Sequence, residues 1–403
     1  MQSIIFPWSD SWWLEKDKAW FCAGNIGALF CVDMVSERCQ LVAWIPERNA
    51  QNFRLYSYCA KFGDIVFCIA NLAHCIWCYD IKKEAWKKIE VGNMNELIMC
   101  MHAHKGKNDQ IWLLEDGTGN IFQLDLKRQA IKVEQEYQYG CHKNMEFYEY
   151  TIVEDSIYRV GECKIFGMSK SCISVYEIEE AKAGLCTICY DGQNFWMSGF
   201  CKEIYIWNPK QGMIKVITEF PEQFGYYHFA KDEMPVVDCD SFHSIDFPFF
   251  MNSIPMNRYI WFIPFCSDEI VYIDKENYEV HLLEIEEERE TKESIHNHIM
   301  PHKYLVQYIR ENRYIGLYSL RNALIFEIDT IELRVIKRNY KLTGATMLSI
   351  LNVAEGYHNE KILKEGRKMD DLYFSEMLKA KNSKIGNQID SVGEKIYHLL
   401  ELS

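Results

Sequence analysis

Two pairs of cysteines have the spacing that zinc sites and redox disulfides use, Cys75–Cys78 and Cys186–Cys189. Thiolates three positions apart can share one metal ion when a tight turn brings the two sulfurs together. Both pairs fall inside runs typical of β-strands, CIWCYD and GLCTICYD, and residues three apart on a strand point to opposite faces. We therefore expect neither pair to bind a metal, and we expect the protein to hold no cofactor.

Three histidines in one segment, His296, His298 and His302, are a second candidate metal site because imidazole is a common ligand of transition metals. The segment, residues 284–302, begins as an acidic run and is interrupted by Pro301. Such a charged run is typical of a solvated loop. We expect a loop here and no metal site.

An aromatic segment provides the candidate surface for a ligand or a partner. Residues 221–241, PEQFGYYHFAKDEMPVVDCDS, are rich in aromatic and acidic side chains. Loops carry binding residues more often than the cores that they connect. The binding candidates are Phe224, Tyr226, Tyr227, His228 and Phe229. The alternative is a long loop that folds onto its own sheet.

The elements that must position these residues form an internal repeat. An aromatic residue recurs thirteen positions before an Asp, and once twelve positions before an Asn. The pairs are Trp20 and Asp33, Phe67 and Asp80, Trp112 and Asp125, Trp261 and Asp274, and Trp196 and Asn208. Around each pair, two β-rich runs are joined by a short polar turn, which predicts a hairpin. An Asp or Asn at the end of the second run can turn the chain by hydrogen-bonding its own backbone, which gives the recurrence a mechanical cause.

Each hairpin has one β-rich run before it and another after it, so that a unit holds four strands. The units begin near residues 11, 53, 96, 145, 184, 242 and 303. The stretch from 145 to 179 supplies four runs without the Asp, and insertions at 221–241 and 286–302 account for the two long steps. Four-stranded units of roughly 40–50 residues are the signature of propeller blades.

By these features the chain resembles a β-propeller, of the divergent bacterial kind that has neither the WD40 nor the kelch motif. The resemblance covers residues 1–342 and implies an all-β fold of seven four-stranded antiparallel blades, with six or eight blades as alternatives. A two-domain β-sandwich would also give many short strands, but it would not repeat the spacing from aromatic residue to Asp. Large rings on second strands fill the space between sheets, so the tryptophans of the repeat are predicted to be buried between blades.

Residues 343–403 lose the β pattern and form a predicted helical tail. From Asp370 onward, apolar side chains recur at steps of three, four or seven, which makes one stripe of a helix. The stripe consists of Phe374, Leu378, Ile385, Ile389, Val392, Ile396 and Leu399. Asn382 occupies a stripe position, and a buried Asn can set the register of a coiled coil. The stripe can pack on the propeller of its own chain, or it can bind a partner protein or a second copy in a dimer.

Charge and composition limit the partners and the compartment. Lys plus Arg number 44 against 58 Asp plus Glu, a formal net charge of −14, so we expect no nucleic-acid partner. The sequence has no run of about 18 apolar residues and no signal pattern at its N-terminus, so we expect no membrane association. The 16 cysteines lie mostly within apolar runs, where a free thiol behaves as a small hydrophobe. We expect reduced thiols, no structural disulfide and a cytoplasmic location.

Two hypotheses of function follow. The first is a cytoplasmic binding or scaffold protein that uses a propeller face and the C-terminal amphipathic helix to engage a partner protein or a ligand. The alternative is a propeller enzyme, a hydrolase or lyase that acts on a sugar or a peptide at the mouth of the central channel. The sequence has no GxSxG, no P-loop and no HExxH, so the catalytic residues of such an enzyme stay unknown. Titratable groups with perturbed pKa values around the channel would favour the enzyme.

Overall fold

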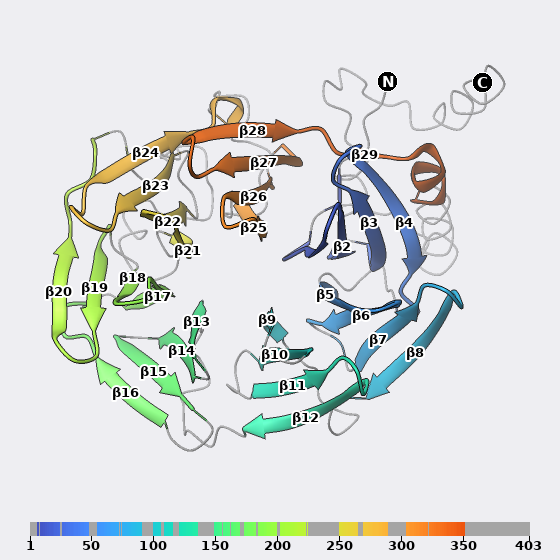
Figure 1. Ribbon diagram of the computed structural model, residues 1–403, viewed down its shortest axis with the longest axis horizontal. Coiled ribbons are helices and arrows are strands. Elements are labelled where there is room, and N and C mark those ends of the chain that lie inside the picture. The colour runs from blue at the N-terminus through green and yellow to red at the C-terminus, as the bar shows by residue number, and fades with distance from the viewer. Residues whose placement is uncertain are drawn as a thin grey trace, which may run out of the picture. The chain divides into compact units, whose positions relative to one another are not determined.

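The chain forms a ring of seven antiparallel sheets (Figure 1). This ring occupies residues 8–341, which make one compact unit, while residues 1–7 and 342–403 belong to another. The computed structural model describes residues 6–7, 9–24, 26–47, 55–71, 73, 75–90, 100–105, 109–115, 121–135, 149–154, 156–161, 163–169, 173–182, 184–199, 202–222, 224, 250–264, 269–288, 304–320 and 322–350. The prediction of an all-β, seven-bladed propeller is confirmed, and the weak unit from 145 to 179 is a blade of its own.

Each blade takes four strands that follow one another in the chain. Blade 1 contains β1 (Trp13–Glu15), β2 (Lys18–Ala23), β3 (Ala28–Asp33) and β4 (Arg38–Trp44). Blade 2 contains β5 (Tyr56–Phe62), β6 (Ile65–Ala70), β7 (Cys75–Asp80) and β8 (Ala85–Glu90). Blade 3 contains β9 (Cys100–Lys105), β10 (Gln110–Glu115), β11 (Ile121–Asp125) and β12 (Ala130–Gln135). Blade 4 contains β13 (Tyr150–Val153), β14 (Ser156–Gly161), β15 (Lys164–Met168) and β16 (Ile173–Glu177).

The remaining three blades repeat this pattern. Blade 5 contains β17 (Leu185–Tyr190), β18 (Phe195–Gly199), β19 (Ile204–Asn208) and β20 (Gly212–Ile217). Blade 6 contains β21 (Phe250–Met256), β22 (Tyr259–Pro264), β23 (Glu269–Asp274) and β24 (Val280–Glu284), which the short helix η2 (Glu286–Glu288) follows. Blade 7 contains β25 (Tyr304–Arg310), β26 (Tyr314–Ser319), β27 (Leu324–Asp329) and β28 (Arg334–Arg338). The two-residue strand β29 (Lys341–Leu342) adds a fifth strand to the outer edge of blade 1.

The position of a strand in its blade decides how much of it is buried. First strands such as β5, β13 and β21 lie nearest the propeller axis, and fourth strands such as β8 and β24 lie at the rim (Figure 1). Second strands are covered on both faces by neighbouring blades, so five of the six residues of β6 and of β22 are buried. The rim strand β8 exposes four of its six side chains. Continuous apolar runs in the sequence therefore correspond to inner strands, and runs that alternate apolar and polar residues correspond to rim strands.

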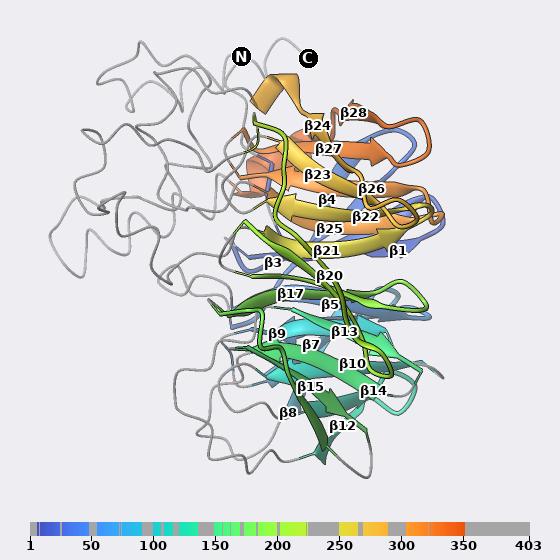
Figure 2. The same cartoon turned by 90° about the vertical axis from the view of Figure 1, so that its left-hand side faces the viewer.

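The repeated Asp or Asn performs the turn that the sequence predicts. Asp33 Oδ1 accepts hydrogen bonds from the amides of Val35 and Ser36 at 3.0 and 2.8 Å. Equivalent bonds form at Asp80, Asp125, Asn208, Asp274 and Asp329. Each closes the connection between the third and fourth strands of a blade. In an antiparallel blade this connection opens on the same side as the one between the first two strands, and we call that side of the ring the turn face (Figure 2).

The aromatic partner of each Asp lies between blades, as predicted. Trp20, Trp196 and Trp261 are buried, with 6%, 0% and 0% of their surface exposed, while Trp112 is half-buried. Trp20 belongs to a continuous apolar cluster that runs through blades 1, 2 and 3. Similar clusters join blades 5 and 6 around Trp196 and blades 6 and 7 around Trp261.

The ring closes between blades 7 and 1 without exchanging a long strand. The amide of Lys341 donates to the carbonyl of Glu37 at 2.8 Å, and the amide of Trp12 donates to the carbonyl of Gln307 at 2.6 Å. Gln307 Nε2 also donates to the carbonyl of Ser9 at 2.7 Å. The Trp12 ring stacks on Phe21 in blade 1 and contacts Tyr308 in blade 7, with ring centroids 5.2 and 5.4 Å apart. Closure therefore depends on side chains that occur once in the chain.

In the other unit, residues 344–350 are helical. Thr343 Oγ1 accepts a hydrogen bond from the amide of Thr346 at 3.3 Å, as an N-cap residue does. The predicted apolar stripe of the tail lies outside the described residues. Within the part of the chain that the structure describes, no helix has the length and apolar character needed to span a bilayer.

Candidate functional site

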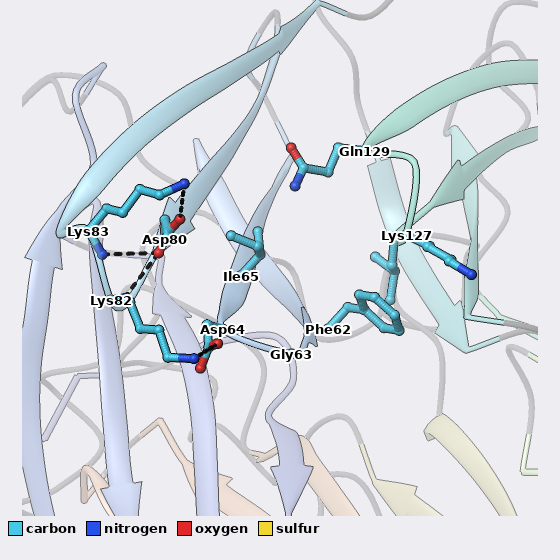
Figure 3. Close-up of a pocket in the computed structure, with 10 residues that line it drawn as sticks. Phe62, Gly63, Asp64, Ile65, Asp80, Lys82, Lys83, Lys127 and Gln129 are labelled. Carbon is cyan, nitrogen blue, oxygen red and sulfur yellow. Dashed lines mark hydrogen bonds and ion pairs between the residues drawn. The ribbon is translucent and has the colours of Figure 1, made fainter.

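A pocket opens on the turn face where blades 2 and 3 meet (Figure 3). Three turns build it: the β5–β6 and β7–β8 turns of blade 2 and the β11–β12 turn of blade 3. Its volume is about 400 Å³, and it is broadly open to solvent. Because the blade 3 turn follows the blade 2 turns by more than forty positions, only the ring geometry brings them together.

Charged side chains surround this pocket. Lys82 Nζ lies 2.6 Å from Asp64 Oδ2, and Lys83 Nζ lies 3.2 Å from Asp80 Oδ2. Lys127 is exposed and forms no ion pair with any residue that the structure describes. Figure 3 shows Lys127 on the opposite side of the pocket from Lys82 and Lys83. The three lysines that line the pocket therefore come from two blades.

Hydrogen bonds within the turns favour the ionised forms of Asp80 and Lys82. Asp80 is one of the repeated turn residues, and its Oδ1 accepts hydrogen bonds from the amides of Lys82 and Lys83 at 3.1 and 3.0 Å. The hydrogen bond from the Lys83 amide holds the pKa of Asp80 below its usual value. The hydrogen bond to the Asp64 carboxylate raises the pKa of Lys82. The Asp80 carboxylate and the Lys82 ammonium group are therefore ionised at neutral pH.

An apolar floor lies between the charged groups. Phe62 and Ile65 are half-buried and pack against the cluster shared by blades 1 to 3, and Leu126 is a buried member of that cluster. Lys87 Nζ of blade 2 donates to Gln129 Oε1 of blade 3 at 2.9 Å and ties the two walls together. The pocket can thus hold a ligand that combines negative charge with an apolar group.

The lining of the pocket is limited to a few residue types. None of its ten residues is a histidine, a cysteine or a serine, and its charged groups are lysines and aspartates. Asp64 and Asp80 are already paired with lysines. The sequence offered one signal for this site, the lysines that follow the repeated Asp, but it did not reveal that two such turns meet.

A second site lies beside the propeller axis, where Glu149 immediately precedes β13. The carboxylate reaches the first strands of blades 5 and 6, which face the axis (Figure 1). Glu149 Oε2 accepts hydrogen bonds from the amide of Ile188 at 3.0 Å and from Ser253 Oγ at 2.8 Å. The amide of Ser253 donates to both carboxylate oxygens at 3.1 and 3.0 Å, and Asn252 Nδ2 donates to Oε1 at 3.3 Å. The sequence gave no indication of this cluster.

The five hydrogen bonds from these four donors account for the position of Glu149. A first strand has no neighbouring strand on its axis side, so amides that point there need another acceptor. The Glu149 carboxylate supplies that acceptor for two blades. Burial raises the pKa of Glu149 to about 8, although the hydrogen bonds from Ser253, Ile188 and Asn252 oppose the shift. Because its oxygens are engaged by the chain itself, the arrangement serves cohesion between blades.

The aromatic binding candidates lie mainly outside the described residues. Phe224 is the member of the set that the structure describes, and its ring is 1% exposed. It stacks on Phe250 with ring centroids 5.5 Å apart and on Phe220 with centroids 5.4 Å apart. In this position Phe224 packs against blade 6 and presents no exposed surface. Tyr226, Tyr227, His228 and Phe229, and the histidines at 296, 298 and 302, are outside the described residues.

The CxxC pairs lie on strands as predicted, Cys75–Cys78 on β7 and Cys186–Cys189 on β17. Cys75 Sγ donates to Glu47 Oε2 at 3.3 Å. Burial raises the pKa of Cys75 and of Cys186 to about 12, so both remain protonated thiols. The ten cysteines that the structure describes are free. Across the described ranges, no three His, Cys, Asp or Glu side chains are arranged to hold a metal ion.

Comparison with known proteins identifies the fold. A scan against protein-family models gives no match, and a search of curated proteins gives none. Among solved structures, a streptogramin B lyase is 13% identical with a TM-score of 0.52, and the match covers 83% of this chain and 94% of the lyase. An inactive virginiamycin B lyase from Staphylococcus aureus with quinupristin is 14% identical with a TM-score of 0.53, covering 80% and 94%. YCF48 bound to D1 peptide is 6% identical with a TM-score of 0.51, covering 81% and 91%.

At these identities the likeness shows the β-propeller fold alone. The fold is shared by lyases and by proteins that bind peptides, so it does not choose between the two functions. Function has to be argued from the sites of this chain.

Proposed function

We propose that the protein is a binding or scaffold protein that engages a partner protein through the turn face of its propeller and through its C-terminal helix. The observation that carries the proposal is the open pocket between blades 2 and 3. It joins exposed lysines to an apolar floor, and none of its ten lining residues is a histidine, a cysteine or a serine. The solved propeller YCF48, which is bound to a peptide, supports the idea that such a ring can present a peptide-binding surface.

The tail provides the second contact in this proposal. Its stripe holds seven apolar side chains, from Phe374 to Leu399, and each is worth roughly 1.5–3 kcal/mol when fully buried. A lone helix of this length is marginal in water, so a partner protein or a second copy of the chain would supply most of its stability. Free thiols at all ten described cysteines support the proposed cytoplasmic location.

The alternative, an enzyme that acts on a sugar or a peptide at the channel mouth, has one observation in its favour. Burial near the axis brings the pKa of Glu149 to about 8, a range in which a carboxyl group can act as a general acid. Five hydrogen bonds from the chain nevertheless occupy its oxygens, and none of the described residues near it is a histidine. We therefore favour binding.

Photo-crosslinking in the native cells tests the binding function. A photoreactive amino acid is placed in the full chain at Lys127, at Lys210 on the turn face of blade 5, or at Ile389 in the tail. We expect a discrete protein adduct from at least one turn-face position and one from the tail. If no position gives an adduct while the protein is folded and abundant, the binding function is wrong.

Truncation tests the role of the tail. Removal of residues 344–403 should leave a stable monomeric propeller and abolish assembly, as measured by light scattering and thermal melts of both proteins. A full-length monomer whose melting temperature falls steeply on truncation would contradict this expectation, because the stripe would then pack on its own propeller.

A further inference from the structure

We propose that the pocket between blades 2 and 3 binds an acidic segment of the partner protein, with carboxylates on Lys82, Lys83 and Lys127 and an apolar side chain on the floor. The proposal rests on the proposed binding function and gives it a chemical class of ligand. It follows from three properties of the pocket, which are its charge, its floor and its openness.

Charge is the first property. The chain as a whole carries a formal net charge of −14, yet three lysines and two aspartates line this pocket, which leaves it positive by one charge. Asp80 is held by two backbone amides of its own turn, so it does not move to meet Lys127. An approaching carboxylate therefore finds one unpaired ammonium group on blade 3 and two paired ammonium groups on blade 2.

Lys82 and Lys83 can bind a ligand carboxylate with little loss of free energy from their ion pairs. The side chains of Lys82 and Lys83 are 75% and 79% exposed, and exposed ion pairs contribute little because water and salt screen them. Each ammonium group has three donors on a flexible stem, so it can keep one hydrogen bond to its aspartate and give another to a ligand. The aspartates thus hold the lysines at the rim without using up their hydrogen-bonding capacity.

The apolar floor and the open shape of the pocket favour a peptide segment over a small molecule as the ligand. Phe62, Ile65 and Leu126 offer apolar surface between the lysines, which suits an acidic sequence that carries an apolar side chain among its carboxylates. Sites for small molecules usually enclose most of the ligand surface. A pocket of about 400 Å³ that is broadly open on one side encloses too little of a free metabolite, but it can receive part of a segment whose remainder lies across the turn face.

Charge reversal in the full-length protein tests the proposal. The probe is a fluorescein-labelled twelve-residue peptide of Glu and Asp with a central Leu-Phe pair, followed by fluorescence anisotropy. Its matched forms replace the acids by Gln and Asn, or by Lys. The test variant combines Lys83→Glu with Lys127→Glu, and the control variant combines Lys210→Glu with Lys337→Glu, two exposed lysines on blades 5 and 7. Both variants change the net charge by the same amount.

We expect the acidic peptide to bind the native protein and the control variant equally, and to bind the test variant at least about tenfold more weakly. Binding should weaken severalfold between 50 and 200 mM NaCl. The amide and lysine peptides should not compete. A Phe62→Ser variant should also bind more weakly at unchanged salt dependence, because it removes floor surface without changing charge.

Three results would overturn the proposal. One is equal binding to the test and control variants. Another is absence of binding by the acidic peptide while inorganic pyrophosphate or a deoxythymidine dodecamer binds in a way that depends on Lys83 and Lys127. The third is absence of binding by every probe. If crosslinking still yields a partner adduct at Lys210 or Ile389, the acidic-segment proposal fails alone and the binding function stands.

Discussion

Two buried carboxylates lie under opposite electrostatic conditions. Glu327 links strands within blade 7, whereas Glu149 links the first strands of blades 5 and 6. Glu327 Oε2 accepts hydrogen bonds from Arg310 Nε at 2.9 Å and from Tyr308 Oη at 3.0 Å, and Oε1 pairs with Arg338. Glu149 is surrounded by amide and hydroxyl donors alone among the described residues that contact it.

The difference appears in the pKa values of the two groups. Burial acts to raise both. At Glu327 the hydrogen bonds and positive charges of Arg310 and Arg338 outweigh burial, and the pKa lies below its usual value. At Glu149 the hydrogen-bond donors among the described residues are neutral, and burial raises the pKa to about 8. In this pair, the guanidinium groups beside Glu327 more than offset burial, whereas the neutral donors around Glu149 offset it only in part.

Loss of the Glu327 carboxylate should have the largest effect. Glu327→Ala leaves two guanidinium groups and the Tyr308 hydroxyl at the closing blade without their shared acceptor. We expect the free energy of unfolding to fall by about 2–4 kcal/mol, measured by urea denaturation. Glu332→Ala is the control, because Glu332 is exposed and lies 4.0 Å from Arg313. An unchanged urea midpoint for Glu327→Ala would mean that this network does not stabilise the closed ring.

The raised pKa of Glu149 predicts a fall in stability with rising pH. The folded state holds the proton more tightly than the unfolded state, so stability is fully present below about pH 4.5 and is lost as pH rises toward about 8. The slope contributed by this group is at most about 1.4 kcal/mol per pH unit. Glu149→Gln, which like the protonated acid presents one acceptor oxygen, should remove this slope. Urea midpoints at pH 5, 6.5 and 8 measure this slope. A wild-type profile that matches the variant would show that the four donors keep the carboxylate ionised.

The comparison also explains what could be predicted from the sequence. Asp33, Asp80 and Trp196 belong to residue types that recur at fixed spacing, because each blade uses the same turn and the same aromatic side chain between sheets. A local pattern therefore reveals them. Glu149 and Glu327 are not part of the repeat. Glu149 contacts Ser253 across 104 positions, and no periodicity marks such a pair.

The pocket between blades 2 and 3 could be predicted only in part. Lys82 and Lys127 follow the repeated Asp, so their place on a turn was predictable, but their approach to one another depends on how far blade 3 is rotated from blade 2. The repeat in the sequence predicts the individual blades, whereas a site between two blades can be found only from their arrangement in the folded ring. For Phe224, the sequence left open a ligand surface or packing on its own sheet, and in the structure its ring is buried against Phe250.

A smaller effect is expected at the outer part of the closing seam. Glu37 Oε2 accepts a hydrogen bond from the amide of Asn339 at 2.9 Å, and Oε1 lies 3.5 Å from Arg338 Nη1. Glu37→Ala should lower the free energy of unfolding by about 1 kcal/mol, since its side chain is partly solvated. Glu84→Ala, at an exposed turn position of blade 2, is the matched control. A loss as large as that of Glu327→Ala would mean that the outer seam, and not the buried carboxylate, closes the ring.

The smallest effect should come from Asp329, a turn carboxylate that has both a cation and backbone donors. Arg313 binds it through two hydrogen bonds of 2.9 and 2.6 Å, and its hydrogen bonds are the main reason that the pKa of Asp329 lies at about 2. Stability from this pair is therefore present above about pH 4 and is lost as pH falls toward 2. Asp329→Asn keeps the turn acceptor, as Asn208 shows in blade 5, where its Oδ1 accepts from the Lys210 amide at 2.9 Å.

Asp329→Asn should consequently flatten the acid limb of the stability profile and cost little at pH 7, because the Arg313 side chain is one-third exposed and screened. Asp125→Asn is the control, since Arg128 lies 3.7 Å from Asp125 and is 83% exposed. Melting temperatures between pH 2.5 and 7 compare the two variants. If the acid limb is the same in wild type and Asp329→Asn, the Asp329–Arg313 pair does not cause it. The acid limb would then belong to other carboxylates with depressed pKa values, such as Glu327 and Asp274.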